Sequence, residues 1–182
     1  MTKLLFIRHG ETDLNKQHKT IGQAFDVPLN NKGVGQAEGV TDKLSKDIDL
    51  FFASPQKRAR QTAEIINKKL NLDIEFRNEL KERDYGSLSG HIWEEMAQMS
   101  NIDNIHELDK TLQYDYRPFG GESIEDVKSR FLGLVSELKE EYPDKKILVV
   151  THGGLMKIMH SVYSQKEIPV IGNATIHEFN MQ

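Results

Sequence analysis

The sequence has no cysteine, and it holds only one tryptophan and five prolines among 182 residues. Without cysteine the chain can form neither a disulfide nor a thiolate metal site, which excludes a disulfide-stapled secreted scaffold and a cysteine zinc motif. It also lacks an apolar run of membrane-spanning length and a signal-peptide core near either end. We therefore expect a cytoplasmic protein with no membrane partner.

The sequence contains fewer basic than acidic residues: 24 lysines and arginines and 28 aspartates and glutamates give a net charge of −4. A nucleic-acid or anionic-membrane partner would require a strongly basic surface, so we expect neither. Any phosphate site must be a local basic pocket. The length is that of one globular domain able to bury a sizeable core, and we expect a single domain over residues 1–182.

Two short apolar runs end in the same way. Leu4–Ile7 runs directly into Arg8 and His9, and Ile147–Val150 leads one residue later to His152. Four consecutive large apolar residues are too few for a helix and fit a strand that is buried on both faces. In open α/β sheets the functional residues follow the carboxyl ends of the strands. The repeated pattern therefore predicts one pocket built from two strand ends.

Apolar periodicity predicts alternating strands and helices along the rest of the chain. Strands are expected at 4–7, 49–53, 72–76, 147–150 and 175–179, and helices at about 32–44, 58–70, 91–100, 123–142 and 153–162. Ser54 is expected to cap the helix that follows it, and Met99 to face inward. We expect a surface loop at 15–30 and irregular structure at 101–121.

The connections between the first four strands are long enough for right-handed helical crossovers, which makes these strands mutually parallel. The last strand, 175–179, is expected to be an antiparallel strand at the edge of the sheet. The predicted fold class is α/β: a three-layer sandwich with a mostly parallel central sheet and helices on both faces.

Five polar residues follow the strand ends and should therefore meet at one edge of the sheet. They are Arg8 and His9 after the first strand, Arg58 after the second, Glu82 after the third and His152 after the fourth. Such groups are costly to bury unless they bind one another or a ligand. Arginine presents a planar fork that matches phosphate oxygens, and the N–H groups of Gly153 and Gly154 open a helix, where the dipole favours an anion. A phosphoryl group fits this set, and no metal or other cofactor is needed because the guanidinium groups supply the positive charge.

A histidine beside a bound phosphoryl group can attack phosphorus in line and form a phosphohistidine that later passes the group to water. On this reasoning either His9 or His152 can be the nucleophile. Glu82 is the candidate acid for the leaving oxygen and the candidate base for the water. A histidine metal site is a remote alternative. The other histidines lack a partner pattern and are interpreted as surface or core residues: His18, His91, His106, His160 and His177.

The motif Arg8-His9-Gly10-Glu11-Thr12, followed by Asn15, resembles the signature of the histidine phosphatase superfamily, which contains the cofactor-dependent phosphoglycerate mutases and many phosphatases. The similarity extends along nearly the whole chain in the order of the family's blocks. The further matching blocks are Asp26-Val27-Pro28-Leu29, Ser54-Pro55 with Arg58, Glu82 with Tyr85-Gly86, Gly120-Gly121-Glu122-Ser123 and Thr151-His152-Gly153-Gly154.

The resemblance implies a role for each site residue. It makes His9 the phosphorylated nucleophile and Glu82 the proton donor. The other implied site positions are Arg8, Arg58 and His152 in the phosphate pocket, Asn15 and Gln23 beside it, and Tyr85 on the substrate side.

The family's mutases are longer than this chain and carry a C-terminal tail over the site, whereas the chain ends at Gln182 directly after its last expected strand. This favours a metal-independent phosphomonoesterase that hydrolyses a small phosphorylated metabolite through phospho-His9, because a mutase must shield its phosphohistidine from water. The alternatives are a 2,3-bisphosphoglycerate-dependent phosphoglycerate mutase and a catalytically silent phosphate-binding regulatory module. Residues 91–121 are a candidate substrate lid. The substrate and the oligomeric state stay open.

Overall fold

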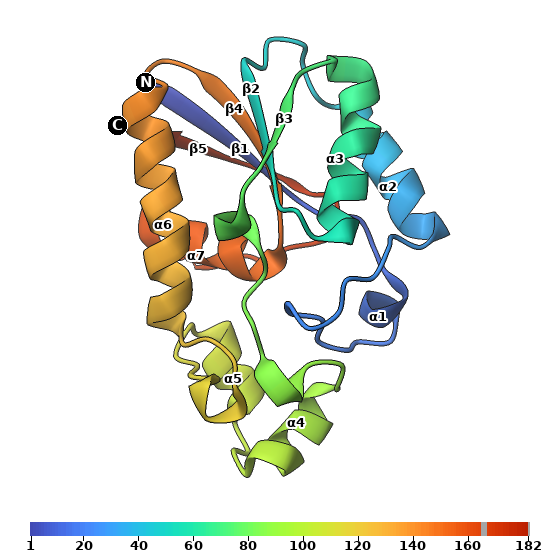
Figure 1. Ribbon diagram of the computed structural model, residues 1–182, viewed down its shortest axis with the longest axis vertical. Helices are drawn as coiled ribbons and strands as arrows, with labels where there is room; N and C mark the ends of the chain where they lie inside the picture. The colour runs from blue at the N-terminus through green and yellow to red at the C-terminus, as the bar shows by residue number, and fades with distance from the viewer. Residues whose placement is uncertain (165–166, 182) are drawn as a thin grey trace.

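A five-stranded sheet lies at the centre of the computed structural model, which describes residues 1–164 and 167–181 (Figure 1). In spatial order the strands are β3 (Ile74–Phe76), β2 (Leu50–Ala53), β4 (Lys146–Thr151), β1 (Thr2–Arg8) and β5 (Ile176–Met181). The first four are parallel to one another, and β5 pairs antiparallel with β1 at the edge. The predicted mostly parallel α/β sheet with one antiparallel edge strand is confirmed.

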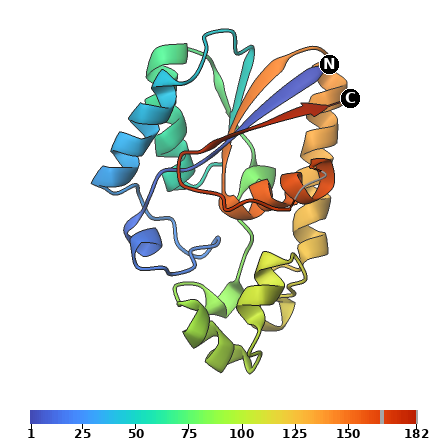
Figure 2. The same ribbon diagram turned by 180° about the vertical axis from the view of Figure 1, so that it is seen from behind.

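Helices cover both faces of this sheet. The helices α2 (Asn31–Asp42) and α3 (Lys57–Leu70) lie on one face, and α6 (Ile124–Glu141) and α7 (Gly153–Tyr163) lie on the other, as the two opposite views show (Figures 1 and 2). Among the residues that the structure describes, none of the helices has both the length and the hydropathy needed to cross a membrane.

The opening apolar run is buried because β1 is covered on both sides. Leu4 and Phe6 pack with the core beneath α6 and α7, whereas Leu5 and Ile7 pack with the core beneath α2 and α3. Successive side chains of a strand point to opposite faces, so both faces of an interior strand must be apolar. Each of these side chains contributes roughly 1.5–3 kcal/mol by its burial. The strand that ends at Arg8 is thus held rigidly.

Shorter elements lie beyond the carboxyl ends of the parallel strands. They are α1 (Asp13–Lys16), η1 (Asn78–Leu80), η2 (Gly86–Leu88), α4 (Trp93–Ser100), α5 (Ile105–Lys110) and η3 (Arg117–Phe119). Figure 1 shows α4 and α5 below the sheet, at the end opposite the chain termini. The expectation of irregular structure at 101–121 is wrong, because α5 and η3 form there and Asp115 pairs with Ser123 in a β-bridge. The apolar positions Ile105, Leu108 and Leu112 follow helical spacing, but over only six helical residues.

Three local predictions also fail. Ser54 does not cap α3: the helix begins at Lys57, whose N–H instead donates to the Asp26 carboxylate at 2.5 Å, from a loop far away in sequence. Met99 is 49% exposed, because α4 is a surface helix with only Met96 fully buried. Part of the predicted loop at 15–30 is also helical, since α1 extends to Lys16 and is capped by Thr12.

Candidate active site

A cavity of about 750 Å³ opens at the carboxyl edge of the sheet. Its wall includes Arg8 and His9 from the end of β1, Arg58 from α3, Glu82 from the segment after β3, and Gly153 at the start of α7. Tight connections at the strand ends bring these residues together, since each follows its strand by only a few positions. The edge predicted from the sequence is therefore one physical cavity.

His9 is buried, and each of its ring nitrogens has a hydrogen-bond partner. Its Nδ1 lies 2.7 Å from the carbonyl oxygen of Gly10, to which it can only donate, so Nε2 carries the lone pair. The Arg58 Nε donates to that Nε2 at 3.3 Å. Burial, followed by the positive charges of Arg58 and Arg8, lowers the pKa of His9 well below its usual value. The lone pair of Nε2 therefore faces Arg58, in a ring whose neutral form is favoured by burial and by the two arginines.

The Arg58 side chain is buried and Arg8 is partly buried, and neither forms an ion pair with a carboxylate of the described residues. The Arg58 guanidinium donates to the carbonyl oxygens of Phe25 and Gly22 at 3.2 and 3.0 Å, and Arg8 Nη1 donates to Ile171 O at 2.6 Å. Within the described part of the chain neither arginine has an acidic oxygen within 4 Å, and Arg8 Nε has no hydrogen-bond partner. Burial lowers the pKa of Arg8, and that of Arg58 to about 10, so both remain charged at neutral pH.

The Glu82 carboxylate acts on both guanidinium groups only from beyond ion-pair distance, so the electrostatic demand of this pair is only partly met. An anion at the cavity floor would meet it. The N–H of Gly153, at the N-terminus of an eleven-residue helix, adds a donor and a favourable dipole beside Arg8.

His152 lies beside His9, with ring centroids 5.2 Å apart, and is fully buried. Its Nε2 and the hydroxyl of Ser54 are 2.8 Å apart, so the serine that fails to cap α3 orients this ring instead. The Nδ1 of His152 has no partner among the described residues, and the ring is not part of the cavity wall. Burial, with Arg58 and His9 adding to it, lowers the pKa of His152 well below its usual value.

Glu82 lines the cavity as a carboxylate. Burial acts to raise its pKa, but the charge of Arg83 and the backbone N–H groups of Arg83 and Gly154, at 2.9 and 3.1 Å, lower it on balance. The expectation that both glycine N–H groups at 153–154 serve an anion is therefore wrong for Gly154, whose N–H is already bound to Glu82. Only the N–H of Gly153 is left for that purpose.

The residues implied to surround the phosphate pocket differ in their placement. Asn15 and Tyr85 line the cavity, although the Asn15 side chain also closes the cap of α1 at Thr12. Gln23 is not among the lining residues, and its amide donates to Glu122 at 3.1 Å. The prediction that Gln23 lines the pocket is thus wrong, because the side chain points toward the base of α6.

A buried charged cluster beside Glu82 was missed in the sequence. Asp109 of α5 pairs with Arg83 at 2.8 Å and with Lys157 of α7 at 3.3 Å, and it accepts the hydroxyl of Tyr116 at 3.0 Å. Arg83 Nη1 has no partner among the described residues, and both Arg83 and Lys157 reach the cavity wall. Although burial acts to lower it, the Asp109 carboxylate raises the pKa of Arg83 on balance. In the sequence, only the position of Lys157 could have indicated this cluster: it lies four residues after Gly153, and residues four apart share one face of a helix.

The outer wall of the cavity is aromatic. Trp93 and His106 stack with centroids 4.5 Å apart and planes inclined by 13°, and both line the cavity. His106 was interpreted from the sequence as a residue without a role, because its partner lies on a different helix. The cavity thus joins a cationic floor to a flat, partly apolar mouth.

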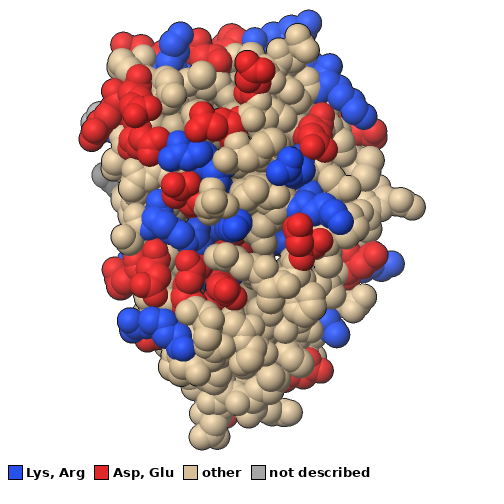
Figure 3. Space-filling view, in the orientation of Figure 1, with Lys and Arg blue, Asp and Glu red and all other residues tan. Residues whose placement is uncertain are grey.

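Charge elsewhere is mixed. On the face shown in Figure 3, basic and acidic side chains are interspersed without an extended patch of one sign. Over residues 1–164 and 167–181, no group of three or more histidine, aspartate and glutamate side chains is arranged to hold a metal ion.

Comparison with known proteins gives three findings of family resemblance. The sequence model of the histidine phosphatase superfamily (branch 1) matches residues 4–180. The chain is 39% identical to an uncharacterized phosphatase, PhoE, of Bacillus subtilis over 84% of this chain and 72% of that protein. It is 30% identical to a metal-independent phosphoserine phosphatase of Arabidopsis thaliana over 88% of this chain and 68% of that protein.

Two solved structures share the whole fold. Bacillus stearothermophilus YhfR superposes with a TM-score of 0.87 and 26% identity over 100% of this chain and 92% of that one. A mycobacterial glucosyl-3-phosphoglycerate phosphatase in complex with VO3 superposes with a TM-score of 0.84 and 25% identity over 97% of this chain and 91% of that one.

Proposed function

Because the chain belongs to the histidine phosphatase superfamily (branch 1), we propose that it is a metal-independent phosphomonoesterase that hydrolyses a small phosphorylated metabolite through a phosphohistidine on His9. The observation that carries this proposal is the neutral His9 Nε2, which contacts Arg58 and lies in the field of Arg8, while neither arginine forms an ion pair with a described carboxylate. A phosphoryl group would neutralise the arginines and place phosphorus against the nucleophile. The mycobacterial relative in complex with VO3 adds support, since that group also carries oxygen ligands around a central atom.

In the first step, His9 Nε2 attacks phosphorus, the N–P bond forms and the bond to the ester oxygen breaks. Arg8, Arg58 and the Gly153 N–H hold the equatorial oxygens, and His152, whose ring centroid lies 5.2 Å from that of His9, is proposed as a further member of the phosphate pocket. The Nδ1–H bond to the Gly10 carbonyl stabilises the positive charge that develops on the His9 ring.

Glu82 handles the proton in both steps. Because Glu82 is ionised in the empty site, the substrate monoanion supplies a proton, which Glu82 relays to the departing oxygen. In the second step Glu82 takes a proton from the water that attacks the phosphohistidine. The N–P bond breaks as the new P–O bond forms, Glu82 returns its proton to the released phosphate, and dihydrogen phosphate leaves with both residues in their starting state.

The substrate is proposed to carry a second anionic group near its phosphate. Arg83 Nη1, which is buried and unpartnered among the described residues, and Lys157 lie on the cavity wall next to Glu82, with Asp109 as their shared counter-ion. Asp109 and Glu82 together balance the two positive charges, so the proposal rests on the free Arg83 Nη1 donor, whose hydrogen bond a substrate carboxylate would accept. The names of two relatives, phosphoserine phosphatase and glucosyl-3-phosphoglycerate phosphatase, denote compounds with such a carboxylate. Residues 91–121, which contribute Trp93 and His106, are the proposed cover over this part of the site.

The test of the reaction is direct. Brief incubation with a labelled aryl phosphate is expected to leave an acid-labile label on the wild-type protein and none on His9→Ala, and activity is expected to survive EDTA. Glu82→Gln is expected to lose about 10²–10⁴-fold in kcat on alkyl phosphates and far less on 4-nitrophenyl phosphate, whose leaving group needs little protonation. Full hydrolysis by His9→Ala would refute the nucleophile.

A second candidate is a 2,3-bisphosphoglycerate-dependent phosphoglycerate mutase, because a relative of that name from Beijerinckia indica is 31% identical over 86% of this chain. Supplying 3-phosphoglycerate with the bisphosphate separates the two: a mutase isomerises the substrate, and the proposed phosphatase only releases phosphate. A catalytically silent phosphate-binding module is excluded by any hydrolysis that His9→Ala abolishes.

A further inference from the structure

Glu82 lies in a stretch without regular secondary structure. Residues 81–85 connect η1 to η2, and neither a strand ladder nor a helix fixes their backbone. The Glu82 N–H donates to the side chain of Gln56 at 2.8 Å. A group that must reach the ester oxygen needs to be held within a fraction of an ångström, so other parts of the protein must position this stretch.

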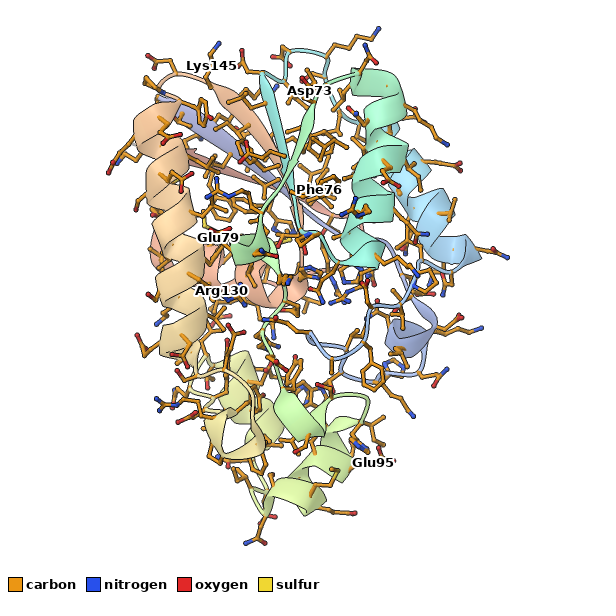
Figure 4. The ribbon with its side chains drawn as sticks, viewed as in Figure 1. Asp73, Phe76, Glu79, Glu95, Arg130 and Lys145 are labelled. Atoms are coloured by element: carbon orange, nitrogen blue, oxygen red, sulfur yellow. The ribbon has the colours of Figure 1, made fainter. Side chains whose placement is uncertain are left out.

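Arg130 of α6 supplies three hydrogen bonds to that stretch. Its Nη1 donates to the carbonyl oxygens of Glu79 and Lys81 at 2.8 and 2.9 Å, and its Nη2 donates to the carbonyl oxygen of Glu82 itself at 3.2 Å. Figure 4 shows Arg130 reaching from α6 toward the turn at Glu79, directly below the end of β3. One guanidinium therefore fixes the backbone on the N-terminal side of Glu82 and at Glu82.

Glu122 completes the arrangement from the other side. It accepts Arg130 Nε at 2.7 Å and Nη2 at 3.0 Å, and its Oε2 also accepts the N–H of Asp84 at 2.9 Å. Backbone bonding adds to this, since the Glu122 N–H donates to Asp84 O at 3.0 Å. The pair thus holds residues 79, 81 and 82 through the arginine and residue 84 through the glutamate.

We propose that Arg130 and Glu122 are positioning residues that hold Glu82 at the distance needed for proton transfer to the leaving group. The inference rests on the proposed role of Glu82 as acid and base. Neither Arg130 nor Glu122 is among the residues that line the cavity, so neither is expected to touch the phosphoryl group. Their loss should affect the proton-transfer step and leave phosphoryl binding nearly unchanged.

The chain offers a matched control in Arg77. It also forms a two-pronged pair with a glutamate of α6, Glu137, at 2.7 and 2.9 Å, and the arginine side chains of both pairs are 20% exposed. The Arg77 side chain donates to no backbone carbonyl of residues 79–82. A general loss of packing between α6 and this region would therefore follow from Arg77→Gln as well as from Arg130→Gln.

The experiment measures kcat and KM of Arg130→Gln, Arg130→Lys, Arg77→Gln and Glu82→Gln with 4-nitrophenyl phosphate and with an alkyl phosphate. We expect Arg130→Gln to lose about 10- to 100-fold in kcat on the alkyl phosphate, less than threefold on the aryl phosphate, and little in KM. Arg130→Lys keeps the charge without the fork and should show the same selectivity to a smaller extent. Arg77→Gln should match the wild type on both substrates.

A double variant distinguishes positioning from general stability. In the Glu82→Gln background Arg130→Gln should cost almost nothing further, because the group it positions is already inactive. Equal losses on both substrates, or an undiminished loss in that background, would overturn the inference and leave the proposed function intact. If Glu82→Gln itself loses equally on both substrates, Glu82 is not the acid, and the proposed mechanism fails first. Should Arg130→Gln not fold, Arg130→Lys and Glu122→Gln give the same readout.

Discussion

Replacing Asp109 by asparagine tests how much of the site's stability depends on one buried carboxylate. Asp109 is 1% exposed and is the shared partner of Arg83, at 2.8 Å, and Lys157, at 3.3 Å. Asparagine keeps the shape and removes the charge, so Arg83 stays buried without an ion-pair partner at this position. Breaking a buried pair in this way costs about 3–5 kcal/mol, whereas loss of the neutral hydrogen bond from Tyr116 costs about 1 kcal/mol.

Urea denaturation of the wild type, Asp109→Asn and Tyr116→Phe measures these differences in the free energy of unfolding. Tyr116→Phe is the matched control, since it removes the 3.0 Å bond to the same carboxylate without touching its charge. The double variant Asp109→Leu with Arg83→Met should recover most of the loss, because it removes the buried guanidinium together with its counter-ion and leaves only the partly exposed Lys157 ammonium without this partner. A cost below about 1 kcal/mol for Asp109→Asn, or a double variant no more stable than the single one, would refute the reasoning.

Three further predictions concern pH, substrate and packing. Burial and two arginines lower the pKa of His9 well below its ordinary value. In a plot of kcat/KM against pH for an alkyl phosphate, the fall on the acid side should therefore lie well under pH 6.5. A fall centred at pH 6.5, measured while the protein stays folded, would contradict this. The alkaline limb should follow the substrate, whose second pKa is about 6, because the reaction uses the monoanion. Lys157→Met should lower kcat/KM about tenfold for 3-phosphoglycerate and little for glycerol 3-phosphate, which lacks the carboxylate. Equal losses on both substrates would refute the proposal that the substrate carries a second anionic group. Gly33→Ala should destabilise the protein by more than about 2 kcal/mol, since the added Cβ would overlap the Glu11 carbonyl oxygen. The Cβ of Gly35→Ala meets nothing within 4 Å, so this change should stabilise α2 by up to about 1 kcal/mol. Comparable thermal unfolding midpoints for the two variants would contradict the packing argument.

Sequence reasoning succeeded where local pattern and burial agree. Continuous apolar runs identify strands covered on both faces, and β1 and β4 occur where Leu4–Ile7 and Ile147–Val150 predicted them. Reasoning failed where a partner from far along the chain decides a local feature. Asp26 rather than Ser54 caps α3, and Glu122 draws Gln23 away from the cavity.

The sequence by itself determined which residues meet at the carboxyl edge, because each of Arg8, His9, Arg58, Glu82 and His152 follows a strand end within a few residues and parallel strands share that edge. Only the tertiary structure decided how those groups are held. The contacts of Arg130 with the backbone of the Glu82 stretch, and of Asp109 with Arg83 and Lys157, join residues 26 to 51 positions apart in the sequence. Long flexible side chains can reach many partners, and their choice depends on the three-dimensional arrangement of helices that no local pattern encodes.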